Sequence, residues 1–184
     1  SNSNYIYGEY VDAQVHRSSN GGTSASYIDG GITEAGSGAT ANFIAPLLLD
    51  PNSPTRLYVG CASLWVTANA RAFNVSWTAI KSPVGSNISA IAVAPGQSDV
   101  VWVGHNDGQL YRTANATAAN PTWTTVDDNG STNPLPNRYI ERIVIDAANS
   151  SQVYVALGGF SAGNVRVTSN DGVTFSNISG TGAT

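Results

Sequence analysis

Two short apolar runs recur three times along the chain at a constant separation. The third residue of the first run is Leu49, Val93 or Ile145, and an aromatic residue follows nine positions later, at Tyr58, Trp102 and Tyr154 respectively. Turn-forming residues separate the two runs in every copy, as a tight connection between antiparallel strands requires. Repeats of roughly 40 to 50 residues are typical of propellers and solenoids. We therefore expect a tandem array of one small β unit.

Each copy continues with a third apolar run, a polar turn and a fourth run that carries an aromatic residue, at Trp77, Trp123 or Phe175. The first residues hold a partial copy, in which the expected second, third and fourth strands are 5–8, 15–20 and 26–28. Its first strand is missing. The repeat thus predicts a partial unit at 1–31 and complete four-stranded units at about 42–82, 87–128 and 138–180.

Composition supports an all-β chain and excludes several classes of partner. Only 11% of the residues are charged, there are 19 glycines and 8 prolines, and no apolar run has helical spacing over three turns. No stretch of about 18 apolar residues is present, which argues against membrane insertion. The net charge is −4 and Lys81 is the only lysine, so a nucleic-acid partner is not expected. A lysine-poor chain rich in Ser, Thr and Asn favours an extracellular or cell-surface location.

The polar turn after the third strand is the most specific motif. The segment Thr168-Ser169-Asn170-Asp171-Gly172-Val173-Thr174-Phe175 resembles the Asp-box, Ser/Thr-x-Asp-x-Gly-x-Thr-Trp/Phe, with Asn170 in the Asp place, and residues 18–23 keep its first half. A short Asn side chain can accept hydrogen bonds from the turn backbone, glycine takes a positive φ, and the aromatic residue packs between sheets. We therefore expect a structural role for Ser18, Asn20, Gly22, Thr168, Asn170, Gly172, Thr174 and Phe175.

Through these residues the chain resembles the bacterial BNR/Asp-box repeat proteins, a superfamily that includes sortilin-like propellers, sialidases and xyloglucanase-type glycoside hydrolases. The resemblance implies a β-propeller segment of about four consecutive four-stranded blades, the first one partial, within a larger ring. An open arc would leave two apolar blade faces in water, so the expected partners include remaining blades of the same protein or another copy. A fragment of a longer polypeptide, an assembly of copies and a nicked ring all satisfy this; the missing first strand favours the fragment.

In such a fold, the loops that join second to third strands and fourth to first strands gather on one face, where function is usually found. The aromatic residues in register with the repeat are expected to pack in the core. Tyr10, Tyr139 and Phe160 fall outside that register and could stack on a sugar ring. The candidate ligand-binding residues are Tyr10, His105, Asp107, Arg138, Tyr139 and Phe160.

Glycoside hydrolysis needs two carboxyl groups at a defined separation. Glu9 or Asp12 with Glu141, or Asp107 with Asp127 or Asp128, could form such a pair, and the catalytic candidates retained are Glu9, Asp12 and Glu141. The arginine triad and the Tyr/Glu nucleophile pair of sialidases cannot be assembled from this chain. With two histidines and one cysteine, expected to be a buried strand thiol at Cys61, we expect no metal site and no cofactor.

Three functions follow from these observations. The favoured one is an extracellular, non-catalytic recognition or structural module that binds a glycan or protein through its loop face. The alternatives are a part of a secreted, xyloglucanase-like glycoside hydrolase acting on polysaccharide, and a self-assembling extracellular structural protein.

Overall fold

The computed structural model describes residues 4–127 and 134–180. The regular secondary structure of these residues consists of β-strands. The chain divides into two compact units, Ser1–Ile88 and Ser89–Thr184, which are described in turn. In the part of the chain described, no helix is long and apolar enough to cross a membrane. The predicted unit boundaries at residues 1 and 128 lie outside the described residues.

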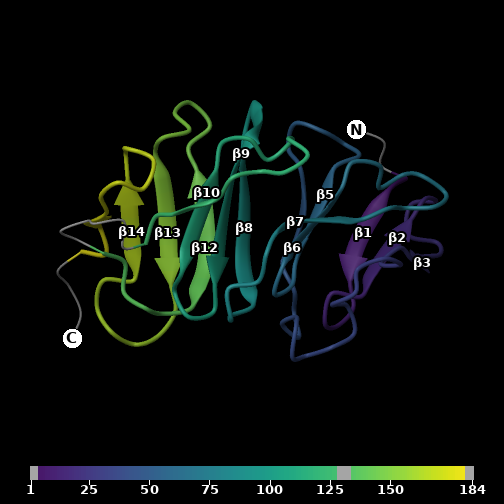
Figure 1. Cartoon of the computed structure of the whole chain (residues 1–184), viewed down its shortest axis with the longest axis horizontal. Coiled ribbons are helices and arrows are strands. Elements are labelled where there is room, and N and C mark those ends of the chain that lie inside the picture. Colours follow the sequence, from purple (N-terminus) through teal and green to yellow (C-terminus); the bar gives the residue numbers. More distant parts are fainter. Residues whose placement is uncertain (1–3, 128–133, 181–184) are drawn as a thin grey trace. The chain divides into compact units, whose positions relative to one another are not determined.

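Unit 1 contains two antiparallel sheets whose strands follow one another in space as they do along the chain (Figure 1). The first sheet has three strands: β1 (Ile6–Glu9), β2 (Val15–Ser18) and β3 (Ser26–Tyr27). The second sheet has four strands: β4 (Leu47–Leu49), β5 (Leu57–Gly60), β6 (Leu64–Thr67) and β7 (Thr78–Lys81).

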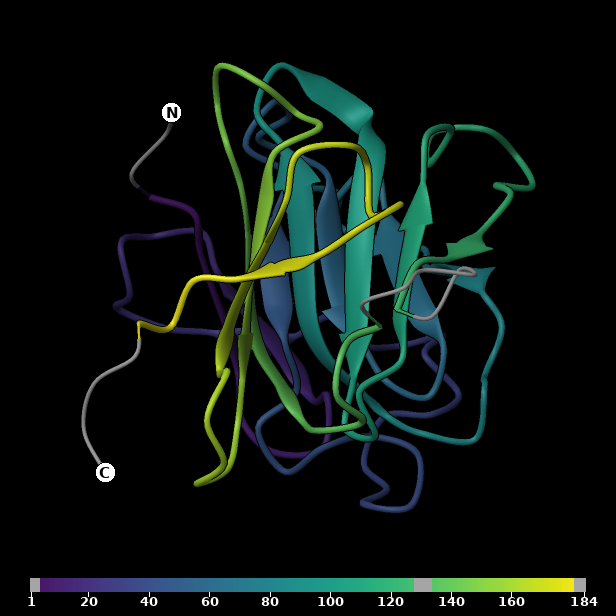
Figure 2. The ribbon, with the colours of Figure 1, turned by 90° about the vertical axis from the view of Figure 1, so that its left-hand side faces the viewer.

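Unit 2 repeats this meander twice, and Figure 2 views it from the side of its last sheet. The third sheet has strands β8 (Ile88–Ala94), which starts at the last residue of unit 1, β9 (Gln97–His105), β10 (Leu110–Thr113) and β11 (Thr124–Thr125). The fourth has β12 (Ile140–Ile145), β13 (Val153–Leu157), β14 (Val165–Thr168) and β15 (Ser176–Asn177). The predicted all-β organisation, with an incomplete first sheet, is confirmed.

The register of the first sheet differs from the sequence-based expectation by one residue. The expected strand was 5–8, whereas β1 is Ile6–Glu9 and pairs Tyr7 with Arg17. The same pairing joins Tyr58 to Val66 and Trp102 to Arg112, so Tyr7 fills the aromatic position of the repeat. The sequence comparison matched Gly8 to Gly60, whereas the observed pairing puts Glu9 in that place. The turn to β2 closes with a hydrogen bond from the Tyr10 N–H to the Gln14 carbonyl (3.0 Å), which fits the observed register.

Each unit has its own core between its two sheets. In unit 1 the apolar cluster includes Val15, Ile28, Val59 and Trp77, and the Trp77 indole N–H donates to the Ile28 carbonyl at 2.6 Å. In unit 2 the cluster includes Trp102, Val153, Val155 and Phe175, and both Trp102 and Phe175 are fully buried. Neighbouring sheets approach closely, because a Cβ built on Gly104 would lie 2.6 Å from Ile140 Cγ2.

An arginine at one repeat position ties each unit's first sheet to its second. Arg17 of β2 donates to the carbonyls of Ala70 and Ala72 at 2.8 and 2.5 Å. Arg112 of β10, at the same position, lies 2.9 Å from a carboxylate oxygen of Asp171. In both units, therefore, the strand that precedes the polar turn of the first sheet, β2 or β10, contacts the polar turn of the next sheet.

The polar turns form the hydrogen-bond network expected for a structural motif. Thr168 Oγ1 accepts from the backbone N–H groups of Asn170 (3.3 Å) and Gly172 (3.0 Å), and Asn170 Oδ1 accepts from the N–H of Thr174 at 3.0 Å. The first turn repeats all of these bonds through Ser18, Asn20, Gly22 and Ser24. Its Ser24 takes the place of Thr174. The same residue types therefore make the same bonds within both turns.

Candidate ligand-binding loops

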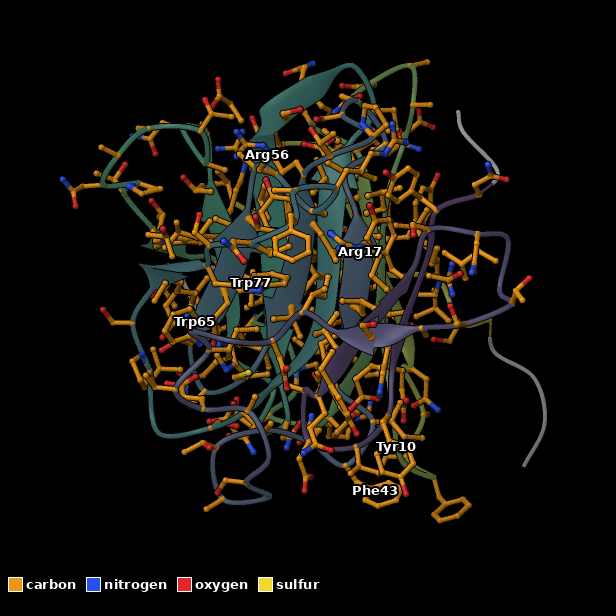
Figure 3. The ribbon with its side chains drawn as sticks, turned by 90° about the vertical axis from the view of Figure 1, so that its right-hand side faces the viewer. Tyr10, Arg17, Phe43, Arg56, Trp65 and Trp77 are labelled. Carbon is orange, nitrogen blue, oxygen red and sulfur yellow. The ribbon has the colours of Figure 1, made fainter. Side chains whose placement is uncertain are left out.

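In unit 1, the β1–β2 turn and the long connection from β3 to β4 meet at one end of the sheets. Figure 3 shows Tyr10 and Phe43 close together there, and the Asp12 N–H donates to the Phe43 carbonyl at 3.2 Å. Tyr10 is 66% exposed and Phe43 is 70% exposed, and the adjacent Ile44 is also exposed. Two aromatic rings in water at a loop end form a surface on which a flat apolar ligand face can stack.

The turn that carries Tyr10 has an unusual backbone. Asp12 and Ala13 have φ values of 51° and 64°, in the left-handed region that costs a non-glycine residue about 1 kcal/mol or more. Its hydrogen bonds include the bond from Asp12 to Phe43, one from the Ala13 N–H to Glu9 Oε1 (3.0 Å), and one from the Gly36 N–H to the Asp12 carbonyl (2.7 Å). These bonds hold the turn in this conformation.

Glu34 is an important residue of this end that the sequence analysis missed. Its carboxylate accepts hydrogen bonds from the Ser63 N–H (2.9 Å), the Ser63 hydroxyl (2.8 Å) and the Trp65 indole N–H (3.1 Å). These bonds fasten the β3–β4 connection to the β5–β6 hairpin. The available signal was its isolation, since Glu34 is the only acidic residue between Asp29 and Asp50 in a segment rich in Gly and Ala.

Cys61 directly follows β5 and is fully buried, as the sequence predicted. Burial raises the pKa of the Cys61 thiol to about 12, and the negative charges of Glu34 and Glu9 add to that shift. The thiol is therefore protonated at neutral pH and behaves as a small apolar side chain.

The catalytic candidates fall in different settings. Glu9 and Asp12 share the β1–β2 turn, where the Glu9 carboxylate caps the Ala13 N–H. Glu141 belongs to unit 2 and lies on the exposed part of β12, beside Gly158. A register shift between Ile140 and Arg142 interrupts the regular pairing of β12 with β13 at Glu141.

In unit 2, the structure brings together three predicted residues. Arg138 donates to the carbonyls of Ser161 (3.1 Å) and Gly163 (3.3 Å) and to Asn164 Oδ1 (2.9 Å), which holds the β13–β14 loop in place. Phe160 stands on that loop with its whole side chain exposed. Tyr139, next to Arg138, is 37% exposed; burial, and then the charge of Glu141, raise the pKa of its hydroxyl.

His105 and Asp107 are in less accessible or already bonded positions. His105 is fully buried at the end of β9, with its ring edge-on to that of Tyr111, 5.5 Å between centroids. Asp107 is exposed, but its carboxylate accepts the backbone and side-chain N–H groups of Gln109 at 3.1 and 2.6 Å. The turn that holds Asp107 packs against the segment before Tyr139, because a Cβ built on Gly108 would lie 2.5 Å from the backbone N of Arg138.

Asp127, which the sequence analysis considered as a partner for Asp107, is bonded to the backbone of β10. Asp127 is buried and accepts the Leu110 N–H at 3.1 Å, while Asp128 lies outside the described residues. Within residues 4–127 and 134–180, no group of three or more His, Cys, Asp or Glu side chains could hold a metal ion.

No protein-family model and no curated protein sequence matches this chain. Among solved structures it is similar to a GH74 enzyme of Niastella koreensis (TM-score 0.71, 18% identity) and the GH74 xyloglucanase of Xanthomonas campestris (0.66, 14%). It is also similar to YCF48 of Cyanidioschyzon merolae (0.63, 16%). The alignments cover 95%, 98% and 98% of this chain but only 27%, 29% and 58% of those proteins. These neighbours are β-propellers, so the four sheets are consecutive propeller blades, the first with three strands. The closer resemblance to BNR/Asp-box proteins stays a prediction.

Proposed function

We propose that this chain is a glycan-recognition segment of an extracellular or cell-surface β-propeller. The observation that carries the proposal is the exposed pair of Tyr10, on the strained β1–β2 turn, and Phe43, on the β3–β4 connection that is hydrogen-bonded to that turn. Sugar rings present apolar C–H faces that stack on aromatic side chains, and their hydroxyl groups bond to nearby carboxylates and backbone groups. Because the turn is already rigid, little conformational entropy is lost when a ligand binds.

Unit 2 supports the same proposal with a second aromatic pair. Tyr139 and Phe160 come from the corresponding types of connection, before a first strand and between second and third strands, and Arg138 orders the loop that carries Phe160.

A second candidate function is hydrolysis of a polysaccharide, which the GH74 neighbours favour by analogy of fold. Against it, in unit 1 the Glu9 and Glu34 carboxylates both accept backbone N–H groups and so help to hold the loops in place. Binding without turnover is therefore our leading proposal.

The test uses xyloglucan oligosaccharides as the first probe, because one neighbour is a xyloglucanase. Titration calorimetry of the wild-type chain should show saturable binding. We expect the double substitution Tyr10→Ala and Phe43→Ala to weaken binding by about tenfold or more, since each lost stacking contact is worth roughly 0.5–1.5 kcal/mol. Phe73→Ala is the matched control, because Phe73 is 95% exposed but lies in the β6–β7 connection, at the other end of its sheet.

Two results would reject the proposal. One is equal binding by the Tyr10/Phe43 variant and the wild type, and the other is an equal loss in the Phe73→Ala control. A reducing-end assay on the same samples addresses the second candidate: release of new ends that Asp12→Asn abolishes would establish hydrolysis in place of simple recognition.

A further inference from the structure

We propose that unit 1 binds a tetrahedral oxyanion, a phosphate or sulfate group, through the guanidinium groups of Arg17 and Arg71. Arg71 lies in the β6–β7 connection, in the polar turn of the second sheet. Figure 3 shows Arg17 well away from Tyr10 and Phe43, the aromatic pair of the proposed glycan site. The two sites are therefore independent of each other.

The two guanidinium groups come together because Arg17 reaches the turn that carries Arg71. Arg17 Nη1 donates to the carbonyls of Ala70 and Ala72 at 2.8 and 2.5 Å, and these two residues flank Arg71 in the chain. Both arginines also act on the Tyr7 hydroxyl. Burial raises the pKa of that hydroxyl, whereas the Arg71 guanidinium, and then that of Arg17, act in the opposite direction. Two positive charges thus lie beside one tyrosine.

The equivalent arginine of unit 2 has a carboxylate partner, which unit 1 does not supply. Arg112 lies 2.9 Å from a carboxylate oxygen of Asp171. The Asp171 N–H donates to the Ser151 carbonyl at 3.3 Å, two residues before β13. In the same way, the Ala70 N–H donates to the Thr55 carbonyl at 2.8 Å, two residues before β5. Ala70 therefore occupies the place of Asp171 and brings no negative charge.

The turn of unit 1 adds positive charge instead. Arg71 follows Ala70 in the chain, whereas the turn of unit 2 has a glycine at that place. In the described part of the chain, the arginines that form ion pairs are Arg56 and Arg112, so neither Arg17 nor Arg71 forms one. An anion bound to both guanidinium groups would offset the repulsion between them and accept charge-assisted hydrogen bonds.

The setting of Arg71 favours an anion with several oxygen atoms. Its Cζ lies 4.7 Å from the centroid of the Tyr5 ring, so the guanidinium is held over an aromatic face. A stacked guanidinium keeps the N–H groups along its edge for ligands in its own plane, and their spacing matches the oxygens of phosphate and sulfate. A doubly charged group also balances two guanidinium charges, which one carboxylate does not.

The experiment titrates the whole chain with sodium sulfate and with sodium phosphate, while sodium chloride keeps the ionic strength constant. Sodium acetate serves as the singly charged comparison. NMR follows the backbone amides and the arginine Nε–Hε groups. We expect saturable binding of both oxyanions, with the largest shifts at Arg17 and Arg71, and weaker binding of acetate. Shifts that never saturate, or acetate binding as tight as that of sulfate, would overturn the proposal.

Two substitutions that each remove one positive charge form a matched pair. Arg71→Gln should weaken sulfate binding by about tenfold or more, because it removes one guanidinium and its charge-assisted hydrogen bonds. Arg142→Gln removes an exposed arginine of β12 and should leave binding unchanged. Equal losses in the two variants would mean general attraction of anions to positive charge and would reject the site. If Arg71→Gln fails to fold, the shifts of the wild-type chain decide alone.

A last comparison identifies the source of the oxyanion. Glucose 6-sulfate and glucose 6-phosphate carry the same groups on a sugar, and they are titrated in the same way. Tighter binding than that of the free ions, lost in Arg71→Gln, would support the site with an ester as its ligand. Tighter binding of the free ions would support it with the ion itself, and binding of neither form would contradict it.

Discussion

At the residue scale, two glycines determine how closely neighbouring strands approach. A Cβ at Gly60 would lie 2.6 Å from Ile88 Cγ2, and a Cβ at Gly104 would lie 2.6 Å from Ile140 Cγ2. Both glycines stand two residues after the repeat aromatic, at the end of the second strand. The repeat in the sequence shows that glycine recurs at this position. Only the structure shows which isoleucine packs against it.

We predict that Gly104→Ala destabilises the chain by roughly 1–3 kcal/mol, the usual cost of forcing an extra methyl group into a packed interface. Urea unfolding followed by tryptophan fluorescence measures the change. Gly8→Ala is the control, because no atom lies within 4 Å of a Cβ built there, and it should change stability little. Similar stabilities for the two variants would show that the Ile140 contact yields easily.

At the element scale, one hydroxyl group accepts backbone hydrogen bonds in each polar turn, and the number of these bonds differs between turns. Thr168 Oγ1 accepts two backbone N–H groups, of which that of the buried Gly172 is the nearer. In the second sheet, Thr67 Oγ1 accepts the N–H of Asn69 at 3.1 Å, and the turn has no glycine. The motif is thus fully formed where its glycine is kept.

Thr168→Val should therefore destabilise the chain by about 2 kcal/mol, because it strands a buried backbone N–H, whereas Thr67→Val should cost about 1 kcal/mol or less. Thermal unfolding by circular dichroism compares the two variants, which have equal changes in shape. A larger loss in Thr67→Val than in Thr168→Val would contradict this ranking.

The strands were predictable from the sequence because the same pattern of apolar residues occurs three times, and positions shared by all three copies locate the strands. The exceptions lie where the copies differ. In the first copy the sequence comparison placed Gly8 where the structure has Glu9, and in β12 a register shift between Ile140 and Arg142 interrupts the regular pairing. Tyr10, Tyr139 and Phe160 were found because they break the repeat, whereas Phe43 and Glu34 required tertiary contacts to be recognised.

At the scale of the whole molecule, the buried thiol makes stability depend on alkaline pH. The folded chain raises the pKa of Cys61 from 9.0 to about 12. The unfolded chain therefore releases this proton first. The contribution of Cys61 is fully present below pH 9.0 and is lost as the pH rises from there through about 12.

We compare the free energies of unfolding of the wild type and Cys61→Ala, from urea titrations at about pH 8 and about pH 10.5. The wild type should be the more stable at the lower pH, and the gap should narrow by about 1–2 kcal/mol at the higher pH. Using the difference between the two chains cancels the tyrosines that titrate in both. A gap that stays constant would mean that the thiol ionises freely in the folded chain.

The arginines that tie one blade to the next also bear on how the chain can be divided. Arg17 and Arg112 occur in the first blade of each unit, while the second blades carry Val66 and Val167 at the same position. A cut between the two blades of a unit would separate Arg17 or Arg112 from its present acceptors, so a truncated protein should keep the two blades of a unit together.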